Sequence, residues 1–136
     1  MKYGFLIIVF GMIIGSCSME EEYPQDWLDN PTKIEWESTK FDFGEIKEGE
    51  RISHTFRCKN VGEQPARIFE CNSNCGCTTA EDCSKKPPVP PGEWGEVTVE
   101  YNSSMRPGPV VKSLTVNMNT DPVPNVLKLV GKVVPN

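Results

Sequence analysis

The sequence predicts an all-β protein, a β-sandwich of about seven short strands. Apolar and polar residues alternate through residues 52–59, which is the period of a strand with one buried face. Other short alternating segments are separated by turn residues, and no segment after residue 33 has a sustained helical period. Short strands punctuated in this way are typical of two antiparallel sheets packed face to face.

The strands are expected in the following order. The first holds Ile34 and Trp36, and the second holds Phe41 and Phe43 and is closed by Gly44. In the third strand Ile52, His54, Phe56 and Cys58 share one face, so His54 is expected to pack in the core rather than to act as a base or ligand. The remaining strands are expected at residues 66–71, 97–101, 114–118 and 126–134.

Residues 72–92 are expected to form a long loop, because the segment is rich in Cys, Pro, Ser and Asn. Its prolines, which lack a backbone N–H, exclude it from the centre of a sheet. They are Pro87, Pro88, Pro90 and Pro91. Pro91-Gly92 fits a tight turn in which glycine takes the left-handed position.

The N-terminal residues predict an export signal. Residues 4–14 carry no charge, a length that suits a secretory hydrophobic region and falls short of a typical transmembrane helix. A retained short anchor is the alternative. The segment ends at Ile14-Gly15-Ser16-Cys17, which resembles a bacterial lipobox, so Cys17 is expected to become the lipidated N-terminus. We therefore expect a signal peptide at residues 1–16, a lipidated acidic tether at 17–33 and one domain at 34–136.

The expected location is the outer membrane, with the protein either surface-exposed or facing the periplasm. Glu20, Glu21 and Glu22 follow Cys17 directly and resemble an acidic surface-export signal, although a solvated acidic tether explains them equally well. The sequence pI is about 4.9, and this acidity argues against nucleic-acid binding. The expected partners are the membrane, through the lipid, and an unknown envelope protein or glycan.

Several ordered motifs resemble a bacterial family known as domain of unknown function 1573. This family is related to the immunoglobulin-like modules of the Hydin and major sperm protein class, so the resemblance implies an immunoglobulin-like sandwich. It covers about residues 39–133. The matching residues are Phe41-Asp42-Phe43-Gly44, Glu48-Gly49-Glu50, His54-Thr55-Phe56, Lys59-Asn60-Val61-Gly62, Cys75-Gly76-Cys77-Thr78, Pro91-Gly92-Glu93, Val97-Thr98-Val99, Gly108 and Lys112.

Five cysteines remain once Cys17 is assigned to the lipid: Cys58, Cys71, Cys75, Cys77 and Cys83. In an exported chain they are expected to form structural disulfides, two bridges leaving one thiol free. Cys58 and Cys71 depart from the family pattern at core positions, so we expect them to pair with each other. Cys83 would then pair with Cys75 or Cys77. A Cys75–Cys77 bridge is not expected, because residues two apart seldom meet disulfide geometry.

Two other uses of the cysteines stay open. Four thiolates could hold zinc or, with fewer ligands, copper(I), although the C-x3-C-x-C-x5-C spacing is not the paired C-x2-C signature. A strained Cys-Gly-Cys bridge could instead serve thiol redox chemistry. We expect a non-enzymatic envelope module that binds or positions another component, with no catalytic residues, metal or cofactor. The alternative is a cysteine-dependent redox or metal-handling protein.

Overall fold

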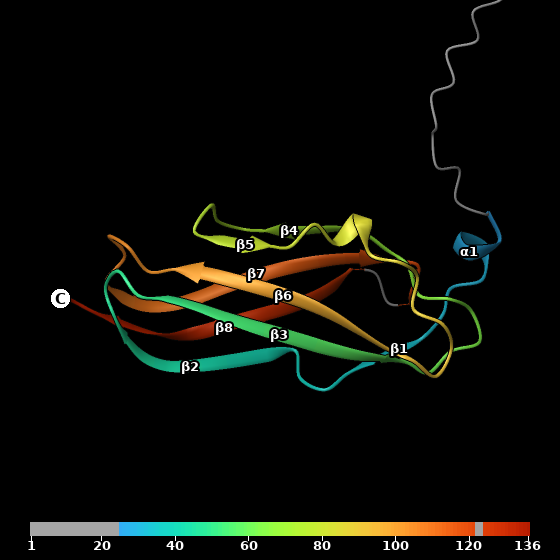
Figure 1. The fold of residues 1–136 in the computed structure, drawn as a ribbon, viewed down its shortest axis with the longest axis horizontal. Coiled ribbons are helices and arrows are strands. Elements are labelled where there is room, and N and C mark those ends of the chain that lie inside the picture. Colours follow the sequence, from blue (N-terminus) through green and yellow to red (C-terminus); the bar gives the residue numbers. More distant parts are fainter. Residues whose placement is uncertain (1–24, 122–123) are drawn as a thin grey trace, which may run out of the picture.

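The computed structural model describes residues 25–121 and 124–136 of the 136-residue chain. The expected signal peptide, Cys17 and the acidic run lie outside these residues. Eight strands form two four-stranded sheets packed as a sandwich (Figure 1). In the first sheet the order is β1 (Ile34–Trp36), β3 (Arg51–Asn60), β6 (Trp94–Asn102) and β5 (Thr78–Ala80). In the second it is β2 (Lys40–Lys47), β8 (Asn125–Val134), β7 (Gly108–Met118) and β4 (Ile68–Ser73).

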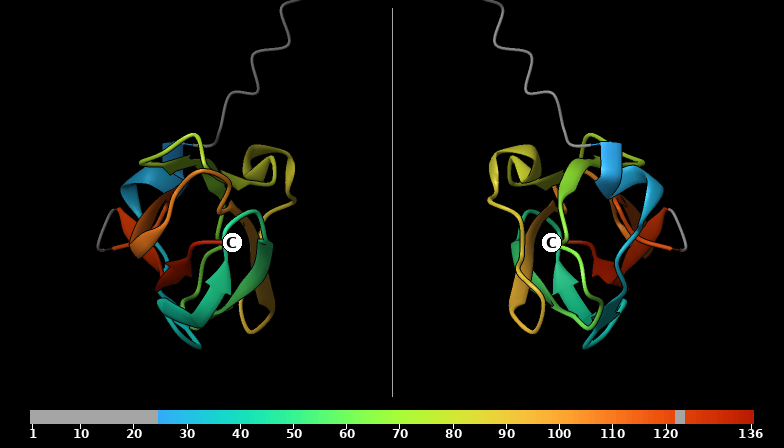
Figure 2. Two further views of the ribbon diagram at one scale, coloured as in Figure 1. Left: turned by 90° about the vertical axis from the view of Figure 1, so that its left-hand side faces the viewer. Right: turned by 90° about the vertical axis from the view of Figure 1, so that its right-hand side faces the viewer.

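The all-β immunoglobulin-like sandwich predicted from the sequence is confirmed. The strands of the two sheets surround a common core when the molecule is viewed end-on (Figure 2). All neighbouring strands are antiparallel except β2 and β8, which run parallel. The core holds the inward-facing side chains that the alternation predicts. Its largest fully buried apolar side chains are Phe56, Val97, Val99, Tyr101, Val116, Leu127 and Val133.

The segment expected to be a loop contains a strand that was not predicted. β5 occupies residues 78–80 and pairs with the C-terminal half of β6, so the sandwich has eight strands rather than about seven. A three-residue strand carries too little alternation to be read from sequence, and its pairing with β6 supplies the hydrogen bonds that fix it. The short 3-10 helix η1 (Cys83–Lys85) follows it.

The segment before the first strand is tied to the domain at its C-terminal end. A one-turn helix, α1 (Gln25–Asp29), lies within the expected tether. Thr32 is buried, its backbone N–H donates to Asn119, and its hydroxyl donates to Asn60. The packed domain therefore begins at about Thr32, two residues before β1. In the described part of the chain no helix is both long and apolar enough to cross a bilayer.

Asn60, at the end of β3, connects four segments of the chain. Its side chain is fully buried, and its carbonyl oxygen accepts hydrogen bonds from the Thr32 hydroxyl (2.9 Å) and the Gly62 amide (3.1 Å). Its amide group donates to the backbone carbonyls of Gln64 (2.8 Å) and Val89 (2.9 Å). A Cβ at Gly62 would overlap the Thr32 side chain. These contacts explain why the Asn60-Val61-Gly62 motif has asparagine at its first position and glycine at its last.

The Phe41-Asp42-Phe43-Gly44 motif closes one side of the sandwich. The ring of Phe41 stacks on His54 at 3.8 Å between centroids, and the ring of Phe43 lies 5.8 Å from that of Tyr101. Gly44 does not close the strand as expected: it lies within β2, at the irregularity between Asp42 and Glu45, and takes φ 72° there. Burial lowers the pKa of His54, which favours the neutral imidazole that this packing requires. His54 is therefore a packing residue, as the alternation predicted.

Candidate functional site

Two disulfide bonds link four of the five described cysteines. Cys71 is bonded to Cys83, and Cys75 is bonded to Cys77. Cys58 is free and buried. The expectation of two bridges with one free thiol is confirmed, but the expected pairing was wrong.

The Cys71–Cys83 pairing follows from the position of η1. This short helix packs against β4, so Cys83 comes next to Cys71 with 5.9 Å between their Cα atoms. Cys58 belongs to the other sheet, opposite Gly95, and packs against the backbone of that glycine. Cys58 lies in the core, as expected, whereas Cys71 is only partly buried at its margin. The residue pattern does not show that η1 brings Cys83 next to Cys71.

The Cys75–Cys77 bridge closes the turn between β4 and β5. The hydroxyl of Ser73 donates to the backbone carbonyls of Cys75 (2.9 Å) and Thr78 (2.6 Å), and the Thr78 amide donates to Cys75 (3.1 Å). These bonds fold the chain back tightly, and the Cα atoms of the two cysteines are 5.2 Å apart. The spacing of the two cysteines in the sequence carries no sign of this turn.

The free thiol of Cys58 is held in its unreactive, protonated form. Burial raises the pKa of Cys58 to about 11, partly offset by the Gly95 backbone and the charge of Lys86, so the protonated form prevails. Among the described residues no group of three or more His, Cys, Asp or Glu side chains is arranged to hold a metal ion.

We expect the Cys71–Cys83 bridge to stabilise the sandwich more than the Cys75–Cys77 bridge. The bonded cysteines are 12 residues apart in the first bridge and 2 in the second, and loop-closure entropy grows with loop length. The double variant Cys71→Ala/Cys83→Ala should lose about 3 kcal/mol of unfolding free energy, against about 1.5 kcal/mol for Cys75→Ala/Cys77→Ala. Urea denaturation under non-reducing conditions measures both. Equal losses would contradict this assignment.

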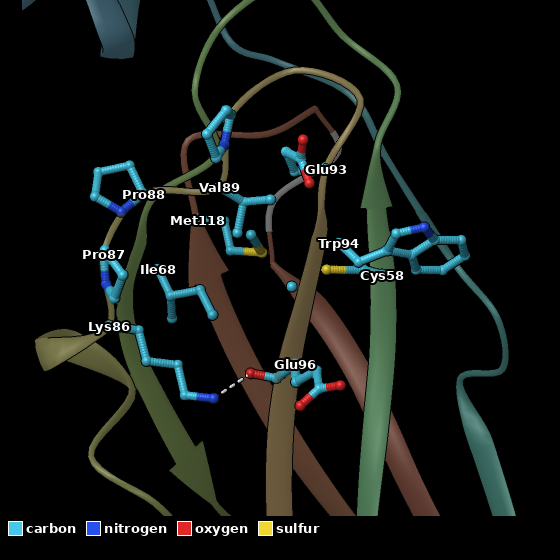
Figure 3. A pocket seen from close by; sticks show the side chains of 12 residues that line it. Cys58, Ile68, Lys86, Pro87, Pro88, Val89, Glu93, Trp94, Glu96 and Met118 are labelled. Atoms are coloured by element: carbon cyan, nitrogen blue, oxygen red, sulfur yellow. Dashed lines mark hydrogen bonds between the residues drawn. The ribbon is translucent and has the colours of Figure 1, made fainter.

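A groove of about 630 Å³ lies at the edge of the sandwich, between the N-terminal half of β6 and residues 86–90 (Figure 3). Trp94 and Glu96 stand on the β6 side of this edge groove, and Lys86, Pro87 and Pro88 stand on the other. The buried side chains of Ile68, Met118 and Cys58 also line it, so the groove reaches the core. The volume is in the range of ligand pockets, which are mostly apolar with a few polar groups.

The backbone of β6 is open along this groove. β5 pairs with β6 only at residues 99–101. Beyond it, the Thr98 amide donates to the Glu81 carboxylate (2.8 Å), and the Glu81 amide donates to the Thr98 carbonyl (3.2 Å). Because alternate residues of a strand point the same way, Glu96 also turns its backbone groups away from β3. Its carbonyl accepts a hydrogen bond from the ammonium of Lys86.

Charged side chains thus take the place of a neighbouring strand at this edge. The Lys86 ammonium lies 2.6 Å from the Glu81 carboxylate. Burial alone would raise the pKa of Glu81, but hydrogen bonds from Lys86 and Thr98 outweigh it and lower the pKa. The Glu81 carboxylate and the Lys86 ammonium are carried by long side chains, which can adopt other rotamers. A protein backbone could then take over their hydrogen bonds to β6.

The rim of the edge groove is aromatic and acidic. Trp94 is 45% exposed, and the guanidinium of Arg57 lies over its ring, 4.8 Å from the centroid. Arg57 also pairs with Glu96 (3.4 Å). Glu93 is exposed at the mouth. No motif of the sequence singles out Trp94 or Glu96 as a site residue. The available signal was the proline-rich segment, which cannot supply a strand beside β6.

A family model described as "Protein of unknown function (DUF1573)" matches residues 34–133. The chain belongs to this family. The match covers every strand except the last residue of β8, so the whole sandwich described above is the DUF1573 domain. The resemblance identified from the sequence motifs is confirmed, and the groove and the cysteine-rich turn both lie within the family domain.

Solved structures similar to the DUF1573 domain include a protein of unknown function from Porphyromonas gingivalis W83, with a TM-score of 0.62 and 16% identity over 74% of this chain and 46% of that one. The chain thus spans less than half of that protein. A PapD-like domain of human CEP192 also has a TM-score of 0.62, at 12% identity over 78% and 88% of the two chains. The secreted serine protease VesC from Vibrio cholerae has a TM-score of 0.56, at 16% identity over 79% and 25%. At these identities the likeness shows the fold alone. A comparison of the sequence with curated proteins found no match.

Proposed function

We propose that this protein is a non-enzymatic cell-envelope lipoprotein whose sandwich binds an extended peptide segment of another envelope component. The observation that carries the proposal is the open backbone of β6 beside an apolar groove. An added strand would gain affinity from main-chain hydrogen bonds to β6 and specificity from side chains placed in the groove. Lipidated Cys17 would hold the module at the membrane.

Export and anchoring rest on two supports. The uncharged segment 4–14 followed by Ile14-Gly15-Ser16-Cys17 has the form of a lipoprotein signal. The two disulfides fit an oxidising compartment outside the cytoplasm, where such bonds persist. Two or more acyl chains on Cys17 would give a stable anchor.

The chemistry of the edge groove favours one class of ligand. Glu96 offers a backbone carbonyl and amide at the spacing of a strand, so the ligand is an extended polypeptide. The floor at Ile68 and Met118 accepts an apolar side chain, and Glu93 at the mouth favours Lys or Arg beside it. The expected ligand is therefore an apolar segment with a flanking basic residue.

A proline at residue 96 tests this proposal. Glu96→Pro removes the free N–H of β6 that an added strand needs, while leaving the ladder with β3, because proline is tolerated at an unpaired edge. Glu96→Ala is the matched control and keeps the N–H. A photo-crosslinking residue at Trp94 in the lipid-anchored protein should capture one partner in intact cells. We expect this crosslink to persist with Glu96→Ala and to be lost with Glu96→Pro. Equal crosslinking in both variants would refute strand addition.

Substitution of the lipidation site should release the protein from the membrane. Without the thiol of Cys17 no diacylglycerol can be attached, so Cys17→Ala should accumulate as an uncleaved or soluble form. Metabolic labelling with a radioactive fatty acid should mark the wild type and not the variant. A Cys58→Ala variant is the control and should label normally. Unchanged labelling of Cys17→Ala would remove the basis for the anchor.

The acidic run after Cys17 is expected to direct the protein to the cell surface. Protease treatment of intact cells should degrade the wild type and spare a variant with alanine at Glu20, Glu21 and Glu22. Fatty-acid labelling of the variant should be unchanged, which separates a sorting defect from a lipidation defect. Equal protection of the two proteins would leave the run as a solvated tether.

A further inference from the structure

The Cys75–Cys77 disulfide lies at the opposite end of β6 from the edge groove. The turn that carries it joins β4 to β5, and the amide of Asn102, the last residue of β6, donates to the Cys77 carbonyl (2.9 Å). Gly76 at the apex is exposed, Cys75 is half-buried, and Cys77 is 8% exposed. One sulfur-bearing residue of the bridge is thus more accessible from solvent than the other.

Other contacts besides this bridge hold the loop in place. Cys71–Cys83 already joins β4 to η1, on the far side of β5. The turn itself is held by the Ser73 hydroxyl through its bonds to Cys75 and Thr78. A bridge between residues two apart also removes little entropy from the unfolded chain. Opening it should therefore leave the sandwich folded.

Hydrogen-bond donors are placed at both sulfurs. The backbone N–H of Cys77 donates to Sγ of Cys75 at 3.1 Å. The hydroxyl of Thr78 lies 3.8 Å from Sγ of Cys77, and in the bonded state only the hydroxyl can donate. Arg106 lines a shallow hollow of about 190 Å³ together with Gly76 and Cys77. Donors and a nearby cation stabilise a thiolate relative to the thiol.

We propose that Cys75–Cys77 is an exchangeable disulfide that oxidises a dithiol of another exported molecule. A thiolate of the dithiol attacks Sγ of Cys75, the S–S bond breaks, and Cys77 leaves as a thiolate beside the Thr78 hydroxyl, in the hollow that Arg106 also lines. The second thiol of the dithiol, as a thiolate, then attacks the dithiol sulfur that is bonded to Cys75. Cys75 is expelled as a thiolate, which the Cys77 N–H stabilises. The dithiol becomes a disulfide and gives up two electrons, and its two protons end on Cys75 and Cys77.

Dithiothreitol, an uncharged dithiol, tests this on the full exported chain under native conditions. After alkylation and peptide mapping, we expect Cys75 and Cys77 to be labelled while Cys71–Cys83 remains bonded and Cys58 remains unlabelled. Circular dichroism should stay that of the folded protein, and an oxidised dithiol should restore the bridge. Reduction of both bridges together, or only after denaturation, would overturn the proposal.

Single-cysteine variants test the direction of attack. Cys77→Ser leaves the accessible Cys75 thiol, and Cys75→Ser leaves the buried Cys77 thiol. With oxidised glutathione, Cys77→Ser should form a mixed disulfide about tenfold faster than Cys75→Ser, following thiol accessibility. Equal rates, or a faster reaction of Cys75→Ser, would contradict the assignment of Cys75 as the attacked residue. Because the groove is remote, crosslinking from Trp94 should be the same in both variants.

Discussion

Asn60→Ala is expected to lower the free energy of unfolding by about 3–5 kcal/mol, because each buried polar group left without a partner costs about 1–3 kcal/mol. The substitution removes two acceptor and two donor contacts at once. The Thr32 hydroxyl and the Gln64 carbonyl lose their partner, whereas the Gly62 amide keeps its bond to Lys33 and the Val89 carbonyl keeps its bond from Ala66. The bond to Thr32 is fully buried, since Asn60 is 0% and Thr32 is 2% exposed, and the other three bonds are partly buried. Urea denaturation followed by circular dichroism measures the loss.

The matched control for Asn60 is Asn117→Ala. Asn117 is less buried and makes a single side-chain bond, to Glu70 at 3.3 Å on the sheet surface, so its loss should cost well under about 1 kcal/mol. Thr32→Val should reproduce part of the Asn60 effect, because it removes one of the four bonds. If Asn60→Ala lowers the free energy of unfolding no more than Asn117→Ala does, the Asn60 side chain does not hold these segments together.

Gly131→Val is expected to destabilise the sandwich by about 4 kcal/mol, above the usual overpacking cost of about 1–3 kcal/mol. A Cβ at residue 131 would come under 3.0 Å from three carbons of the Phe43 ring. Phe43 follows Asp42, which pairs with Val130 of β8, so the register of the two strands brings Phe43 beside residue 131. Thermal and urea denaturation report the change.

A second substitution separates this clash from a general intolerance of side chains in β8. Phe43→Ala removes the ring, so Phe43→Ala/Gly131→Val should be more stable than the sum of the two single losses predicts. Gly76→Ala is the control for replacing a glycine, because a Cβ there meets nothing within 4 Å. Additive losses in the double variant would mean that Phe43 is not the group that excludes a side chain at residue 131.

The sequence by itself determined the fold class and the inward faces of the long strands. The alternation through Ile52, His54 and Phe56 placed these side chains correctly, because a strand has a period of two whatever its partner. Gly92, in the turn expected at Pro91-Gly92, does take positive φ, since that need is local to the turn. Such properties depend on neighbours in sequence, and a sequence can therefore be read for them.

The tertiary structure alone decided the disulfide pairing and the groove. Which thiol reaches Cys71 depends on how η1 packs on β4, and the Cys75–Cys77 bridge depends on a turn held by Ser73. The open edge of β6 exists because β5 ends at Ala80 while β6 continues to Trp94. Each of these outcomes is set by contacts between elements that are distant in sequence, and the pattern of residues within one element carries no information about them.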